Sequence, residues 1–251
     1  GPATEPQRCA WDKLRALGMP GRTDERWRFS NVRAWDLSAY TPAQSVDAGT
    51  REELIGRCIG IAASAGRMVF GNDQILAREV HSEALREKGV IWQSLDVAGR
   101  ENRELVQRYF MREEAILGGE KFAALHGSQV RTGTFLYVPR GVEIDLPIEA
   151  FHWLHGDGGS CFPHTLIVAE EMAKVTLVDY FESSEVGATG FACGVNDLWL
   201  GDGAQLNYVQ YDESAWSFLA RLADEQGLLL LSSQDGVELS GGFRETSHPL
   251  S

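Results

Sequence analysis

The chain has 251 residues, of which 43% are hydrophobic and 24% charged, so it has the composition of a globular protein with one large or two modest domains. Its formal net charge of −13 argues against nucleic acid and anionic membranes as partners, because both are negatively charged. No stretch approaches 18 consecutive apolar residues and the first residues lack the basic and apolar regions of a signal peptide, which together predict a cytoplasmic protein with no membrane-spanning helix.

The first half of the sequence carries mainly helical patterns. Apolar spacing predicts a helix over residues 6–17, and a capping-box pattern at residues 50–53 predicts a second helix that continues to about residue 65. Residues 101–125 are predicted to be helical, with a break at Gly118-Gly119. The positions in this stretch that we expect to be buried are Leu105, Tyr109, Ile116 and Phe122.

Two β features interrupt these helices. Residues 68–70 and 74–76 are short apolar runs on either side of Gly71-Asn72-Asp73, which predicts a hairpin. Residues 90–95 predict a further strand.

Beyond residue 127 the pattern changes to short β-rich runs that are broken by glycine. Valine, isoleucine, leucine and aromatic residues fill these runs, and several alternate with polar residues. The predicted strands are residues 134–138, 142–148, 165–168, 174–181, 195–200, 205–211, 228–231 and 237–239. We therefore expect two domains, an α/β domain over residues 1–127 and an all-β domain over residues 128–251.

An apolar–polar–apolar triplet recurs every 31 residues in the second half. The four copies are Ile144-Asp145-Leu146, Val175-Thr176-Leu177, Leu206-Asn207-Tyr208 and Val237-Glu238-Leu239. A constant period favours a β-helix, or solenoid, in which each unit buries its face on the next. An antiparallel sandwich or barrel, which the short strand spacing also allows, is the alternative.

Several segments resemble a known family. Residues 17–33, which read Leu-Gly-Met-Pro-Gly-Arg-Thr-Asp-Glu-Arg-Trp-Arg-Phe-Ser-Asn-Val-Arg, resemble the N-terminal signature of SufD proteins. Residues 122–126 and 138–148 are similar to the entry into that family's β-helix, and residues 163–181 and 196–206 fit its next two coils. His126 departs from the pattern, because the family usually has asparagine there.

This resemblance implies a function. It implies a non-catalytic scaffold for iron–sulfur cluster assembly that works with SufB and SufC homologues, SufC being the ATPase; a homodimer is the alternative for the isolated chain. It implies no catalytic or cofactor-binding residue and no cofactor held stably by this chain alone, since the parent complex handles the cluster. It also implies that the family's chains continue beyond residue 251, where their SufC-docking surface lies. The glycine-rich stretches lack a Walker lysine, so ATP binding by this chain is not expected.

A metal-dependent enzyme of the cupin type is the alternative function. Its ligands would be His152, His155 and His164, with Cys161 beside them, because imidazole and thiolate bind zinc and iron well. Glycines at 156, 158 and 159 argue against it, since they predict a flexible loop rather than fixed ligand positions.

Two further groups have structural interpretations. Trp27 and Phe29 are expected to pack against the core, although the arginines around them would also suit an anion. None of the four cysteines (Cys9, Cys58, Cys161 and Cys193) forms a Cys-x-x-Cys pair, so we expect reduced, scattered thiols. Cys193 is expected to be a buried thiol that packs as a small apolar group.

Overall fold

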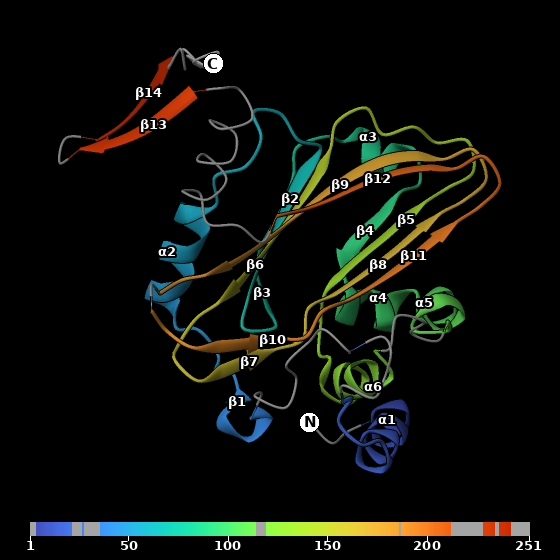
Figure 1. Ribbon diagram of the computed structural model, residues 1–251. Coiled ribbons are helices and arrows are strands. Elements are labelled where there is room, and N and C mark those ends of the chain that lie inside the picture. Colours follow the sequence, from blue (N-terminus) through green and yellow to red (C-terminus); the bar gives the residue numbers. More distant parts are fainter. Residues whose placement is uncertain are drawn as a thin grey trace, which may run out of the picture. The chain divides into compact units, whose positions relative to one another are not determined.

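A computed structural model describes residues 4–21, 27, 36–113, 119–185, 187–211, 228–233 and 236–241. The chain forms two compact units, Gly1–Tyr211 and Asp212–Ser251. The first unit is a mixed α/β arrangement with several parallel and mixed sheets (Figure 1). In the second unit the described residues form one antiparallel hairpin of β13 (Leu228–Ser233) and β14 (Gly236–Gly241).

Six α-helices are described, and they all lie before residue 130. They are α1 (Glu5–Ala16), α2 (Ala48–Arg57), α3 (Ala84–Glu87), α4 (Leu95–Glu101), α5 (Arg103–Tyr109) and α6 (Glu120–Gln129), with a 3-10 helix at Leu37–Ala39. Helix α1 packs beside α6 (Figure 1). The Lys121 ammonium of α6 donates to the carbonyls of Leu14, at 2.7 Å, and Leu17. This cation satisfies carbonyls at the C-terminal end of α1, where the helix dipole is negative.

Three sheets dominate the first unit. Their strands are β1 (Thr41–Pro42), β2 (Gly66–Gly71), β3 (Gln74–Val80), β4 (Ile91–Ser94), β5 (Thr134–Val138), β6 (Ile148–Leu154), β7 (Gly159–Cys161), β8 (His164–Ala169), β9 (Lys174–Ser183), β10 (Gly190–Ala192), β11 (Val195–Leu200) and β12 (Gln205–Tyr211). The sheet orders are β1-β7-β10, β11-β8-β5-β4 and β12-β9-β6-β2-β3. Each of the three therefore takes one strand from each pass of the chain through residues 134–192.

The predicted 31-residue spacing is confirmed in the parallel pairings of the first unit. Strand β8 pairs with β11 from His164↔Val195, and β9 pairs with β12 from Lys174↔Gln205. The β5–β8 and β7–β10 pairs have the same offset, beginning at Thr134↔Thr165 and Gly159↔Gly190. Because alternate side chains of paired strands then coincide, Val175 lies opposite Leu206 and Leu177 opposite Tyr208.

The other triplets do not follow this pattern fully. The 142–148 run is not a strand: only the single bridge Glu143↔Lys174 has the 31-residue offset there, and β6 then pairs with β9 at Ile148↔Leu177, an offset of 29. The triplet Val237-Glu238-Leu239 lies in β14, whose described partner is the antiparallel strand β13. Local spacing could not reveal the two extra residues that the chain contains before β6, relative to the stretch before Leu177 in β9.

One apolar core lies between two of the sheets. It combines Met68, Ile148 and Leu177 of one sheet with Leu136 and Ile167 of the other, and all five are 0% exposed. A second cluster lies under α2 and a third lies between β5, β8 and helices α4 and α5. Strands β5 and β8 are therefore buried on both faces, which explains their almost continuous apolar sequence.

Most of the predicted elements in the first half are confirmed. Helix 6–17 is α1, the strand at 90–95 is β4, and the predicted hairpin is β2–β3, with Asn72 and Asp73 at φ 50° and 57° in its two-residue turn. Positive φ at both positions matches a type I′ turn, and its twist suits paired strands. The predicted helical stretch 101–125 is confirmed only in part: α5 ends at Tyr109, well before the predicted break at Gly118-Gly119, and α6 begins after Gly119. Leu105, Tyr109 and Phe122 are partly buried, whereas Ile116 lies outside the described residues.

The predicted bounds of the second helix are wrong. It begins at Ala48, because the Asp47 carboxylate accepts the Thr50 N–H at 2.9 Å and caps the helix. It ends at Arg57 rather than near residue 65, because the chain turns against strand β6. The Ile61 N–H donates to the fully buried Glu149 carboxylate at 2.8 Å, and a side chain at Gly60 would collide with that carboxylate. A contact 88 residues away thus overrides the local helical pattern.

The proposed division into 1–127 and 128–251 stays a prediction. Strands from before residue 127 complete two sheets of the later segment, since β2 pairs with β6 and β4 pairs with β5. No helix in the described part of the chain is long and apolar enough to cross a membrane.

Candidate functional site

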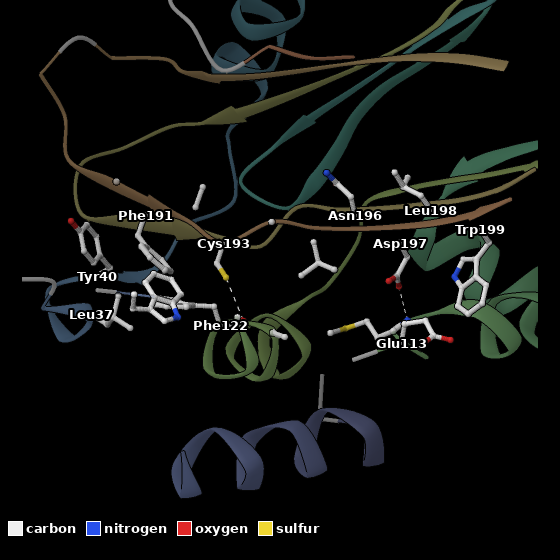
Figure 2. A pocket seen from close by; sticks show the side chains of 18 of the residues that line it. Leu37, Tyr40, Glu113, Phe122, Phe191, Cys193, Asn196, Asp197, Leu198 and Trp199 are labelled. Atoms are coloured by element: carbon white, nitrogen blue, oxygen red, sulfur yellow. Dashed lines mark hydrogen bonds between the residues drawn. The ribbon is translucent and has the colours of Figure 1, made fainter. Parts of the chain in front are cut away.

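A groove of about 1530 Å³ runs along β10 and β11, opposite α6 (Figure 2). Both strands are the outermost members of their sheets among the described residues. The groove is lined by aromatic rings and by carboxylates. The aromatic residues are Trp27, Tyr40, Phe122, Phe191 and Trp199, and the acidic ones are Asp36, Glu113 and Asp197.

Trp27 connects the N-terminal segment to this groove. Its ring lies 5.4 Å from that of Phe122 on α6, so this tryptophan packs against that helix; its predicted packing against the core stays a prediction. Phe29 and the neighbouring arginines lie outside the described residues.

Two buried histidines lie behind the groove, and one of them contacts Asp197, which lines it. His126 of α6 and His164 of β8 are both 0% exposed, and their rings are linked by a 2.9 Å hydrogen bond between Nε2 of His126 and Nδ1 of His164. Asp197 of β11 faces His164, with Oδ2 3.4 Å from Nε2. The Phe110 ring packs on His164 at a centroid distance of 4.6 Å. This arrangement joins α5, α6, β8 and β11.

Cys193 is the thiol that lines the groove. Its Sγ lies 3.5 Å from the Phe122 carbonyl oxygen, to which the thiol donates (Figure 2). Burial raises the pKa of Cys193 to about 11, so the thiol form dominates at neutral pH. This state matches the predicted role of Cys193 as a buried, unreactive thiol.

A second polar cluster lies inside the core, around Asp179 of β9. The Asp179 carboxyl group is 0% exposed and accepts three hydrogen bonds, from His152 Nε2 at 3.1 Å, from Thr165 Oγ1 at 2.8 Å and from Tyr208 Oη at 2.8 Å. The His152 ring is stacked between Phe70 and Phe181, at centroid distances of 4.9 and 4.7 Å. Asp179 therefore connects strands β6, β8, β9 and β12 through a network in which its own acceptors are used.

A small cavity of about 10 Å³ lies next to His152 and is lined by Asp73, Thr132 and Cys161, among others. Burial raises the pKa of Cys161 far above its ordinary value, so this thiol is also protonated. Burial likewise raises the pKa of Asp73 to about 6, although both its carboxylate oxygens accept the Phe162 N–H at 2.9 Å.

Asp73→Asn is expected to stabilise the protein at pH 7.5 by about 1–2 kcal/mol. A carboxyl group whose folded pKa is raised contributes its stability below the ordinary value near 4, and that stability is lost as the pH rises through about 6. Asparagine carries no charge, keeps an acceptor for Phe162 and tolerates the φ of 57°. Urea unfolding at pH 7.5 and pH 4 measures the effect, and an equal gain at both pH values would contradict it.

Of the four predicted metal candidates, His152 and Cys161 line the same small cavity, whereas His155 and His164 make other contacts. His152 lies in β6 and bonds Asp179, while Cys161 ends β7. His155 lies just after β6, where Nδ1 is 2.8 Å from Ser184 Oγ and 3.3 Å from Glu185 Oε1. His164 begins β8 and pairs with His126. The predicted flexible loop is wrong for His152, which the β6 ladder holds in place.

Within the described part of the chain, no three histidine, cysteine or acidic side chains gather in a way that could hold a metal ion. The cupin-type alternative therefore gains no support from the described geometry.

Three residues of these clusters were not predicted: His126 as a partner of His164, Asp179 and Asp197. A signal existed for Asp179, because the alternation along β9 places it on the same face as the core residues Val175 and Leu177. The pairing of His126 with His164 joins positions 38 residues apart, and no local pattern reveals it.

Comparison with known proteins matches almost all of the described first unit to one family. A family model described as the SufBD protein N-terminal region matches residues 4–150, and one described as the SUF system FeS cluster assembly, SufBD core domain, matches residues 152–223. The first of these alone covers more than half of the chain.

Individual relatives agree with the family models. The iron–sulfur cluster assembly protein SufD of Bacillus subtilis (strain 168) is 30% identical over 186 residues, which is 74% of this chain and 42% of that protein. A SufBD family protein of Staphylococcus haemolyticus is 39% identical over 95 residues, covering 38% of this chain and 20% of its own length. The chain thus spans less than half the length of these relatives, and it belongs to the SufBD family, as a SufD-like member.

Proposed function

We propose that this chain is part of a non-catalytic scaffold subunit for iron–sulfur cluster assembly that acts together with SufB- and SufC-type proteins. The observation that carries the proposal is the match of both SufBD family models, which together run from residue 4 to residue 223. The printed name of the Bacillus relative describes an assembly protein, which supports the same role. The complex would work in the cytoplasm.

The state of the reactive side chains supports a scaffold rather than an enzyme. The Cys161 and Cys193 thiols are buried and protonated, so neither is an activated nucleophile. The His152 side chain is hydrogen-bonded to Asp179, and its ring is stacked between two aromatic rings. On this account the isolated chain holds no stable cofactor, and the cluster is bound by the complex.

We also propose that residues 134–211 form successive coils of a β-helix. The repeated 31-residue offset in three sheets supports this architecture, as does the apolar core that strands of two of these sheets share. Val237-Glu238-Leu239 continues the same spacing in sequence, and the assignment of this triplet to the repeat stays a prediction. A crystal structure in which these sheets enclose separate cores would contradict the β-helix.

Co-expression with the SufB- and SufC-type proteins of the same genome tests the proposed partnership. With an affinity tag on this chain, we expect both partners to co-purify at constant ratio and to co-elute in size exclusion. If the chain elutes alone, or only as a homodimer, although both partners are folded, the result would contradict the proposed partnership. A tagged, unrelated acidic protein of similar size controls for non-specific capture.

A further inference from the structure

The hydrogen bonds around His126 fix where its proton lies. Its Nδ1 is 2.7 Å from the Cys193 carbonyl oxygen, which can only accept, so Nδ1 carries the hydrogen. Burial, followed by the neighbouring His164, lowers the pKa of His126 to about 3, so this ring stays neutral. A neutral imidazole has one N–H group, and Nε2 of His126 must therefore accept. The hydrogen in the 2.9 Å bond between the two rings thus belongs to Nδ1 of His164.

This assignment determines what happens on the other side of His164. Its Nε2 is buried, lies 3.4 Å from Asp197 Oδ2 and has no hydrogen-bond partner of its own. If His164 were neutral and Asp197 ionised, the bare Nε2 lone pair would face a carboxylate oxygen 3.4 Å away, and no hydrogen would lie between the two acceptors. One proton between them removes that repulsion, either as an imidazolium facing a carboxylate or as a carboxylic acid facing an imidazole. Both forms contain the same number of protons.

The same oxygen of Asp197 also holds the end of a helix. Oδ2 accepts the Met111 N–H at 2.5 Å, and Met111 follows α5 with a φ of 48°, a left-handed conformation that is uncommon for methionine. The ring of Phe110, the residue before Met111, packs against the His164 ring. On the opposite side, His126 ties α6 to the Cys193 carbonyl. Asp197 therefore links the end of α5 to β11 directly, and it is connected to α6 through His164 and His126.

We propose that His126, His164 and Asp197 together trap one proton, and that this proton holds the end of α5 and helix α6 against β8 and β11. Among the described residues, the titratable side chains that face His164 are His126 from α6 and Asp197 from β11. Cys193 is the next titratable residue, because its backbone carbonyl accepts the hydrogen bond from His126. The three side chains are then neutral overall. Loss of the proton leaves an uncompensated charge on Asp197 and weakens its hold on the helix end. We call these three side chains the proton latch. The latch goes beyond the proposed scaffold function and does not depend on it.

Nuclear magnetic resonance of the full chain tests the trapped proton directly. At pH 7.5 we expect either a hydrogen on His164 Nε2 or a protonated carboxyl carbon signal for Asp197. His155, which is partly exposed beside Glu185, serves as the internal reference for a histidine outside this cluster. An unprotonated Nε2 together with an ionised Asp197 would overturn the proposal.

Asp197→Asn tests the latch. Both contacts use Oδ2, so an amide nitrogen there could donate to His164 but not accept from Met111, and an amide oxygen could do only the reverse. We expect tryptic cleavage after the exposed Arg112 to rise about five- to tenfold, and Met111 amide exchange to accelerate similarly. His155→Gln is the matched control and should leave both unchanged. Unchanged exchange of the Met111 amide in Asp197→Asn would contradict the latch. If this variant does not fold, the magnetic resonance measurement on the unaltered chain still tests whether the proton is present.

Discussion

Asp179→Ala is expected to lower the free energy of unfolding by about 3–5 kcal/mol. The substitution removes the acceptor of three hydrogen bonds at once and leaves His152, Thr165 and Tyr208 with unsatisfied donors. The site is 0% exposed, so water cannot replace the lost acceptor without entering the core. Urea denaturation measures the change.

The control for this effect is Asp145→Ala. The Asp145 side chain is 81% exposed and lies 4.0 Å from the Lys88 ammonium, so its loss should change stability by no more than about 0.5 kcal/mol. Asp179→Asn keeps an acceptor oxygen, so its loss of unfolding free energy should lie between the losses of Asp179→Ala and Asp145→Ala. If the alanine variants at 179 and 145 were equally stable, Asp179 would not connect the strands as described.

Gly133→Ala is expected to destabilise the protein by about 3 kcal/mol or more. A Cβ at this position would lie 2.0 Å from the His164 carbonyl oxygen and 2.8 Å from its carbonyl carbon. Both are backbone atoms in the parallel β5–β8 pair, so no side-chain rotation relieves the collision, and the ladder beginning at Thr134↔Thr165 must shift. Thermal and urea unfolding should both report the loss.

Gly99→Ala gives the opposite expectation for the same chemical change. Gly99 lies inside α4, and an added Cβ meets no atom within 4 Å. Because alanine has the higher helix propensity, we expect a gain of about 0.5–1 kcal/mol. A Gly133→Ala variant as stable as the unaltered chain, or more stable, would contradict the close approach of residues 133 and 164.

Sequence periodicity predicted the strands well where their partners share the repeat. Residues 174–181 and 205–211 alternate in the same phase, and the structure pairs them at an offset of 31. The prediction failed where a distant contact decides the local conformation. Residues 58–65 have helical composition, yet the buried Glu149 draws the Ile61 N–H into a turn.

The candidate site was predictable only in part. His164 and Cys193 could be singled out because imidazoles and thiols are few in this chain, but their partners could not. His126 reaches His164 from a helix, and Asp197 reaches it from a neighbouring strand, so the cluster exists only once α6 and β11 are placed on β8. Asp179 was the exception, since a polar residue in an apolar alternation marks a buried acceptor.

On the proposed function, this chain is part of a scaffold on which a partner complex builds iron–sulfur clusters. The direct measurement is the iron and acid-labile sulfide content of the SufB- and SufC-type proteins after anaerobic reconstitution, with and without this chain. We expect cluster formation in the complex to rise when the chain is present, and no cluster or turnover on the chain alone. Cluster content that is unaffected by adding the chain, although it binds both partners, would contradict the claim.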